Sequence, residues 1–346
     1  MITTDAVIVG AGPCGLFAAF ELGLLGIGAH IVETLDEPGG QCITLYPEKP
    51  IYDIPALPVV SARELIERLR EQMAPFATPI HLGHELSELS ARDSGGFRLR
   101  SSKGLEFHAG AVIIAGGIGS FQPRPLRLPE AARHEGRALH YSVLDRERFR
   151  DRRLVILGGG DSALDWVLEL HPIARSIALV HRRAEFRAAP ASVTRMQTLA
   201  REDPDRLRWL VGQVTGLLED GGRLAGVRVR APAGGSDAVQ QDIACDQLLV
   251  FFGLSPNLGP IAHWGLAIDK RQLCVDAQTL QTSVPGIFAI GDINTYPGKK
   301  KLILTGFHEA AMAAYAVQKY LHPDVKQTVQ YTTTSSALQK RLGVRS

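Results

Sequence analysis

The sequence has few aromatic residues, few cysteines and no large excess of charge of either sign. Aromatic residues make up 6% of its 346 residues, whereas hydrophobic residues make up 45%, a composition typical of globular rather than disordered chains. Lys and Arg number 38 against 36 Asp and Glu, and the formal charge of +2 disfavours a nucleic-acid-binding protein. The length predicts about two domains.

Cysteine spacing and hydrophobic runs exclude two further classes. Cys14, Cys42, Cys245 and Cys274 are widely scattered, and no two adjacent ones have redox-dithiol or zinc-ribbon spacing. A reduced, cytoplasmic protein is the simplest interpretation. Residues 6–20 are largely apolar, but they lack a basic leader and contain a Gly-Pro pair. We therefore expect neither a signal peptide nor a membrane span.

The chain does contain an internal repeat. Residues 7–22 (VIVGAGPCGLFAAFEL) and 155–170 (VILGGGDSALDWVLEL) share an apolar run, a glycine cluster and a helical tail. In each copy the pattern predicts a buried parallel strand, a tight turn and a helix. The sequence therefore predicts two related units.

Other segments indicate how each unit is completed. Further buried strands are expected over residues 29–32, 111–115, 177–180, 247–252 and 286–290, with helices over 61–73 and 309–320. Residues 83–107 and 214–239 alternate in polarity and contain Gly-Gly turns, which predicts a small antiparallel meander in each unit. The fold class predicted is α/β, with two Rossmann-like dinucleotide-binding domains.

The first glycine cluster fits G-x-G-x-x-G. Gly10, Gly12 and Gly15 follow a strand and open a helix, where backbone and helix N-terminus can approach a pyrophosphate. Glu33 ends the next apolar run, where an acid accepts hydrogen bonds from both ribose hydroxyls of a dinucleotide. This site is predicted to hold FAD, with Cys14 inside the motif.

The second glycine cluster differs from the first in the residue expected to contact the ribose. Gly158, Gly160 and Ala163 form G-x-G-x-x-A, with Asp161 and Ser162 between them. His181 stands where Glu33 stands in the first unit, and Arg182, Arg183 and Arg187 follow it. Guanidinium groups bind a ribose 2′-phosphate that an acid would repel. This site is predicted to hold NADPH/NADP+, so a hydride would pass from nicotinamide to flavin.

With these motifs and the late Gly291-Asp292 pair, the whole chain resembles the two-domain flavoprotein reductases of the thioredoxin reductase type. A discontinuous FAD domain is expected over residues 1–115 and 253–346, interrupted by an NADPH domain over 116–252. Thioredoxin reductases carry a Cys-x-x-Cys before the second glycine cluster, but residues 139–145 (LHYSVLD) contain no cysteine. Gly39-Gly40-Gln41, residues 46–49 (YPEK) and Phe121 are similar to the thioredoxin-reductase-like ferredoxin/flavodoxin–NADP reductases.

That resemblance implies a homodimer with one FAD per subunit and no redox cysteines, acting on ferredoxin or flavodoxin away from any membrane. It implies that no side chain is catalytic, since the flavin carries the chemistry. A helix beginning near Gly306 would direct its positive end at the flavin. The FAD contacts that the resemblance implies are Glu33, Gln41, Tyr46, Leu86, Phe121, Asp292, and Tyr331 and Thr333 in a C-terminal tail from about residue 328.

Three questions stay open at this stage. Residues 299–301 (KKK) are a candidate docking patch for acidic ferredoxin, although a solvated surface run explains them equally well. An alternative enzyme is an NADPH-dependent disulfide or quinone reductase, and an alternative of another class is a non-catalytic FAD-binding redox sensor. Tyr331 could cover the flavin of the other subunit, or the tail could be a frayed terminus.

Overall fold

The computed structural model describes residues 1–119, 122–231, 239–255, 257–326 and 331–344, and the chain divides into two compact units. Unit 1 comprises Met1–Phe121 and Pro256–Ser346, and unit 2 comprises Gln122–Ser255. The boundaries lie a few residues beyond the expected positions 115/116 and 252/253. The physical reason is that β9 (Gln122–Pro123) and β18 (Leu254–Ser255), one at each crossing, pair with each other.

Unit 1 is built on a seven-stranded sheet. β1 (Ile2–Val9) lies between two parallel neighbours, β2 (Ala29–Val32) and β8 (Glu106–Ile114). The sheet continues outward to β5 (Ile80–His81) beyond β2, and to β7 (Phe97–Ser101) and β6 (Leu86–Ala91) beyond β8. The first half of β8 pairs with antiparallel β7, and its second half pairs with parallel β21 (Ile287–Ala289). β8 therefore joins the predicted meander to the parallel sheet.

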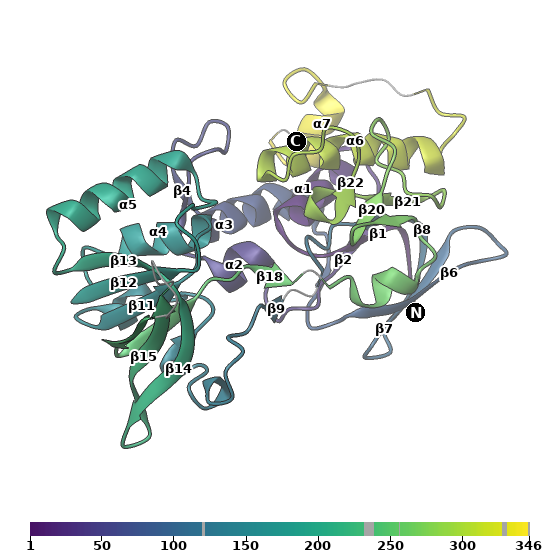
Figure 1. Ribbon diagram of the computed structural model, residues 1–346. Helices are drawn as coiled ribbons and strands as arrows, with labels where there is room; N and C mark the ends of the chain where they lie inside the picture. The colour runs from purple at the N-terminus through teal and green to yellow at the C-terminus, as the bar shows by residue number, and fades with distance from the viewer. Residues whose placement is uncertain (120–121, 232–238, 256, 327–330, 345–346) are drawn as a thin grey trace. The chain divides into compact units, whose positions relative to one another are not determined.

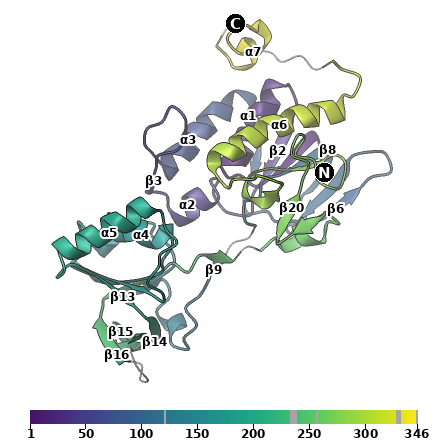
Figure 2. The ribbon, with the colours of Figure 1, turned by 45° about the horizontal axis from the view of Figure 1, so that its top comes forward.

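Helices α1, α3 and α6 cover one face of this sheet, and their apolar side chains form one core with it (Figures 1 and 2). A second core fills the other face against β6, β7 and β20. The remaining bounds in unit 1 are α1 Pro13–Leu24, α2 Gln41–Leu45, β3 Pro50–Ile51, β4 Val60–Ser61, α3 Ala62–Met73, β19 Ile268–Asp269, β20 Gln272–Cys274, β22 Asn294–Thr295, α6 Ile303–Leu321 and α7 Ser336–Arg341.

Unit 2 is a five-stranded parallel sheet in the order β10-β17-β11-β12-β13. Helices α4 and α5 pack on one face, and the antiparallel strands β14–β16 pack on the other (Figure 2). Its bounds are β10 Leu139–His140, β11 Arg153–Leu157, α4 Asp161–Leu170, β12 Ser176–His181, α5 Pro190–Glu202, β13 Leu207–Val211, β14 Gln213–Asp220, β15 Arg223–Ala231, β16 Val239–Ala244 and β17 Gln247–Val250, and single 3₁₀ turns complete both units.

The predicted fold class is confirmed, since both units carry a parallel sheet, a glycine turn leading into a helix, and an antiparallel meander. The turns at Gly95-Gly96 and Gly221-Gly222 connect meander strands, and all four glycines have positive φ. The last core helix is longer than expected: α6 begins at Ile303, not near residue 306 or 309. Its first turn packs on the residues that line the site described next.

Candidate functional site

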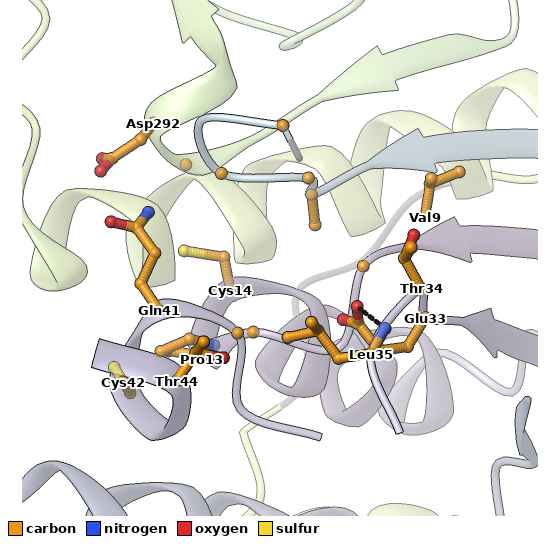
Figure 3. Close-up of a pocket in the computed structure, with 18 of the residues that line it drawn as sticks. Val9, Pro13, Cys14, Glu33, Thr34, Leu35, Gln41, Cys42, Thr44 and Asp292 are labelled. Carbon is orange, nitrogen blue, oxygen red and sulfur yellow. Dashed lines mark hydrogen bonds between the residues drawn. The ribbon is translucent and has the colours of Figure 1, made fainter. Parts of the chain in front are cut away.

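Unit 1 contains a cavity of about 400 Å³ at the carboxyl ends of β1 and β2 (Figure 3). This volume falls in the range of small-molecule sites, and the carboxyl edge of a parallel sheet is where such folds bind nucleotides. The structure brings most of the predicted FAD residues together here. The predicted residues that line the cavity are Gly10, Gly12, Cys14, Glu33, Gln41, Tyr46, Leu86 and Asp292.

The glycines of the first motif have separate roles. A Cβ on Gly10, whose φ is +107°, would lie 2.7 Å from the carbonyl oxygen of Ala115. A Cβ on Gly15 would overlap the carbonyl oxygen of Gly10. These two glycines allow close backbone packing. A Cβ on Gly12 would meet nothing within 4 Å, although Gly12 lines the cavity. The space beside Gly12, at the N-terminus of α1, is therefore open to a ligand.

Glu33 is buried at one end of the cavity. Its Oε2 accepts a hydrogen bond from the backbone N of Ala11 at 2.7 Å. Its Oε1 accepts one from the backbone N of Leu35 at 2.9 Å, which Figure 3 shows as a dashed line. The carboxylate thus joins the glycine turn to the segment after β2. A carboxylate oxygen can accept more than one hydrogen bond, so both retain capacity for ligand hydroxyls.

Asp292 and Gln41 lie at the end of the cavity away from Glu33 (Figure 3). Burial raises the pKa of Asp292, and the nearby charges of Lys301 and Lys299 oppose this rise. The cavity thus has an acid at each end, Glu33 at one and Asp292 at the other. Lys301 also lines the cavity and lies near Asp292. Sequence reasoning missed Lys301 as a lining residue.

Burial keeps the two thiols of this cavity protonated at neutral pH. Burial raises the pKa of Cys14 to about 12 and that of Cys42 to about 11. The Sγ of Cys14 fills the space between Gly291 and Gly306, where an added Cβ on either glycine would meet it closely. Because the thiolate is the nucleophile in disulfide exchange, protonated thiols at neutral pH are poorly suited to that chemistry.

The tail residues do not line this cavity in the chain described. Tyr331 is 69% exposed and Thr333 is also exposed. Beyond them α7 packs back on unit 1, because Leu338 is buried and the guanidinium of Arg341 donates to the carbonyl oxygen of Leu24 at 2.5 Å. Phe121, the remaining predicted FAD contact, lies outside the described residues.

The second glycine motif in unit 2 has the same construction. A Cβ on Gly158 would lie 2.6 Å from the carbonyl oxygen of Phe251, whereas one on Gly160 would meet nothing within 4 Å. Helix α4 begins at Asp161, and Ser162 in its first turn is exposed. Asp161 accepts a hydrogen bond from the backbone N of Ala189 at 2.8 Å, which ties the motif to the start of α5. Ala163 is buried under the turn.

The basic cluster lies beside this motif at the end of β12. The ring of His181 occupies the space next to Gly159 and stacks on Phe186, and burial lowers its pKa. His181 is therefore neutral at pH 7, and the arginines carry the charge of the cluster. Arg182, Arg183 and Arg187 are exposed, and none forms an ion pair with any described residue.

The candidate docking patch at residues 299–301 needs correction. The side chain of Lys299 is 5% exposed and forms an ion pair with Glu309, so it cannot meet a partner protein. Lys300 and Lys301 are exposed. Within the described residues there is no cluster of His, Cys, Asp or Glu that could hold a metal ion, and no helix is both long and apolar enough to cross a membrane.

Comparison with known proteins gives close relatives and a shared fold. The sequence matches the pyridine nucleotide-disulphide oxidoreductase family over residues 4–316. A protein of Parvibaculum lavamentivorans named ferredoxin–NADP reductase is 54% identical over 343 residues, which cover 99% of this chain and 98% of that protein. A protein of the same name from Methylibium petroleiphilum is 53% identical over 349 residues, with coverage of 100% and 94%.

Solved structures of lower identity have the same fold. The thioredoxin reductase of T. acidophilum superposes with a TM-score of 0.78 at 23% identity and covers 94% of this chain and 100% of its own. The Lactococcus lactis thioredoxin reductase in its FR conformation has a TM-score of 0.77 at 22% identity, with coverage of 92% and 99%. These two likenesses concern the fold alone.

Proposed function

Because the chain belongs to the pyridine nucleotide-disulphide oxidoreductase family, we propose that it is an FAD-dependent ferredoxin–NADP reductase. The observation that carries this proposal is the contrast between two glycine motifs of like construction. The first is followed by a buried acid, Glu33, and the second by the exposed arginines Arg182 and Arg183. The relatives of the same name, about 53% identical over the full chain, support the same function.

The cavity of unit 1 fits FAD. Glu33 accepts hydrogen bonds from the adenosine ribose hydroxyls, and the open space at Gly12 admits the pyrophosphate to the N-terminus of α1. Gln41, Tyr46 and Asp292, together with Leu86, complete the FAD contacts that we propose. When bound, FAD accepts a hydride and releases electrons one at a time. The protein's own part is to bind and orient it, and no side chain is needed as an acid or base.

The motif of unit 2 fits NADPH. The open space at Gly160 receives the pyrophosphate at the start of α4, and Ser162 in the first turn is exposed to it. Arg182 and Arg183, with Arg187, bind the 2′-phosphate through charge-assisted hydrogen bonds. The ring of His181 packs against the turn at Gly159. The arginines at this position, where unit 1 has the acid Glu33, favour NADPH over NADH as the electron donor.

The cysteines favour the proposed acceptor over the disulfide alternative. No cysteine occurs in residues 139–145. Burial raises the pKa values of the thiols of Cys14, Cys42 and Cys245. Without a redox dithiol at residues 139–145, bound FAD would pass its electrons directly to the acceptor, for which we propose ferredoxin or flavodoxin. We also propose a cytoplasmic homodimer with one FAD per subunit, in which Tyr331 and Thr333 serve the FAD site. The exposed tail and the free cysteines are consistent with this.

The test begins with the purified protein. We expect a yellow protein whose flavin absorbance is bleached rapidly by NADPH and slowly by NADH, and which supports ferredoxin-linked cytochrome c reduction but not thioredoxin-linked disulfide reduction. Failure of NADPH to bleach bound flavin would refute the enzyme and leave the redox sensor. Disulfide reduction or quinone reduction without ferredoxin turnover would favour the alternative reductase.

Cofactor choice is tested with the double variant R182A/R183A. Loss of two charge-assisted hydrogen bonds, each contributing about 1–2 kcal/mol at an exposed site, should raise the KM for NADPH about 30- to 900-fold and leave NADH turnover unchanged. Arg175→Ala, which removes another exposed arginine of unit 2, is the matched control. An unchanged NADPH/NADH preference would show that the arginines do not read the 2′-phosphate.

A further inference from the structure

A buried carboxylate lies beneath the Asp292 end of the cavity. Glu309, on α6, is 1% exposed and does not line the cavity. Its Oε2 accepts hydrogen bonds from the backbone N of Gly291 at 2.7 Å and from the Nδ2 of Asn294 at 3.0 Å. Its Oε1 accepts hydrogen bonds from the hydroxyl of Tyr296 at 2.7 Å and from the Nζ of Lys299. The side chain of Glu309 thus forms hydrogen bonds with four residues of the segment 291–299.

The partners of Glu309 suit a carboxylate. A backbone N–H, an amide NH₂ and an ammonium group can only donate hydrogen bonds, so three of the four partners require an oxygen that accepts. Lys299, at 5% side-chain exposure, places a positive charge against this carboxyl group. A buried charge pair contributes little net stability, but it is costly to break because the remaining charge is left without its partner.

The held segment includes the Gly291–Asp292 turn. Gly291 has φ +77°, and its N–H is the donor to Glu309, so the carboxylate fixes the turn at the residue preceding Asp292. Cys14 of the first glycine motif packs against Gly291 and Gly306 on the other side. A shift of Glu309 would therefore displace the Gly291-Asp292 turn relative to Cys14 and the first glycine motif.

We propose that Glu309 and Lys299 are positioning residues of the cofactor site, which fix the Asp292 turn and cancel each other's charge beside it. The proposal rests on the proposed binding of FAD in this cavity. With the pair intact, Asp292 and Lys301 are the charges that the described residues present at this end of the cavity. The pair thus sets both the place and the charge balance of the groups that meet FAD.

The opposite charges of Glu309 and Lys299 allow a test that distinguishes this proposal from a purely structural role. The groups that act on Asp292 are Lys301 and Lys299 from the loop before α6 and Glu309 from α6, and the neutral side chains of Cys14, Cys42 and Tyr46 face it from α1 and α2. The charge of Lys299 lowers the pKa of Asp292 and that of Glu309 raises it. Removing one charge of the pair should therefore move this pKa in the direction opposite to removing the other.

The experiment uses the full chain loaded with FAD. The FAD absorption spectrum and the FAD Kd are followed against pH in the wild type, E309Q, K299M and the double variant, and Asp292→Asn identifies the transition that belongs to Asp292. We expect the midpoint to fall in E309Q, to rise in K299M and to return close to the wild-type value in the double variant. Each single variant should raise the Kd about 10- to 100-fold, and the double variant less than the product of the two.

Controls separate this inference from general damage and from the proposed function. Glu71→Gln and Lys103→Met remove exposed charges elsewhere in unit 1 and should change neither the midpoint nor the Kd. If E309Q does not fold, K299M against Lys299→Arg carries the test, because arginine keeps the charge and should keep the midpoint. Midpoints that move together, or not at all, in an FAD-loaded protein overturn the inference alone. A wild type that binds no FAD overturns the proposed function itself.

Discussion

Replacing Glu33 by glutamine should damage the apoprotein as well as FAD binding. The carboxylate accepts one backbone hydrogen bond on each oxygen, from Ala11 and from Leu35. Glutamine offers one oxygen and one NH₂ group, so one of the two N–H donors would face another donor. Glu33→Ala removes both acceptors. The two variants should therefore form a graded series, even in the absence of any ligand.

The size of each step follows from burial. A buried donor that loses its acceptor costs about 1–3 kcal/mol, and we expect the free energy of unfolding to fall by about that amount in Glu33→Gln and by about twice as much in Glu33→Ala. The ribose hydroxyls lose a charged acceptor in both variants, which is worth about 1.5–3 kcal/mol. FAD affinity should therefore fall a further 10- to 100-fold.

Urea unfolding of the apoprotein, followed by far-UV circular dichroism, measures the first effect, and FAD titration measures the second. Glu37→Gln, an exposed acid four residues along the chain, is the matched control and should change neither quantity. An apoprotein of Glu33→Gln within about 0.5 kcal/mol of the wild type would refute the hydrogen-bonding account. Weakened FAD binding in that case would come from the ribose contact alone.

Three further outcomes are expected. Gly12→Ala should fold normally but bind FAD weakly, whereas Gly10→Ala should destabilise the apoprotein by more than about 1 kcal/mol because its Cβ meets the Ala115 carbonyl; equal unfolding midpoints in urea would contradict this. Because burial raises the pKa of Asp292, the folded chain keeps that proton longer than the unfolded chain, and apoprotein stability falls as pH rises from about 3.8 through the raised value. Asp292→Asn should lack this fall, and parallel stability curves against pH for the two proteins would count against it. Tyr331→Ala should alter the flavin spectrum and the rate of reduction by NADPH in stopped flow, and identical traces would remove Tyr331 from the site.

The sequence predicted those parts of the fold that depend on local pattern. Gly10 and Gly158 each follow an apolar run, and the same spacing leads from them to Glu33 and to His181, which Arg182 and Arg183 follow directly. Both motifs and the residues after them could therefore be recognised from residue order alone. The two meanders were predicted because their Gly-Gly turns interrupt segments that alternate in polarity.

What the sequence did not predict depends on contacts between distant segments. Glu309 looks like a surface residue on an amphipathic helix, and Lys299 looks like part of a solvated basic run, yet they form a buried pair. The early start of α6 was missed because Gly306 in its first turns is a poor helix former, and only the fit of Cys14 against Gly306 accounts for its place there. No spacing rule connects these residues.

The pairing of one edge of β8 with two strands, β7 and β21, has a consequence for folding during synthesis. β8 ends at Ile114, but its parallel partner β21 begins only at Ile287, after the whole of unit 2 has been synthesised. Unit 2 can complete its sheet while half of one edge of β8 is still unpaired. A nascent chain stalled before β21 would expose that apolar edge, which is a template for aggregation. The inserted unit thus delays the pairing of β8, and Asp292, which follows β21, can join the cavity only after unit 2 has been synthesised.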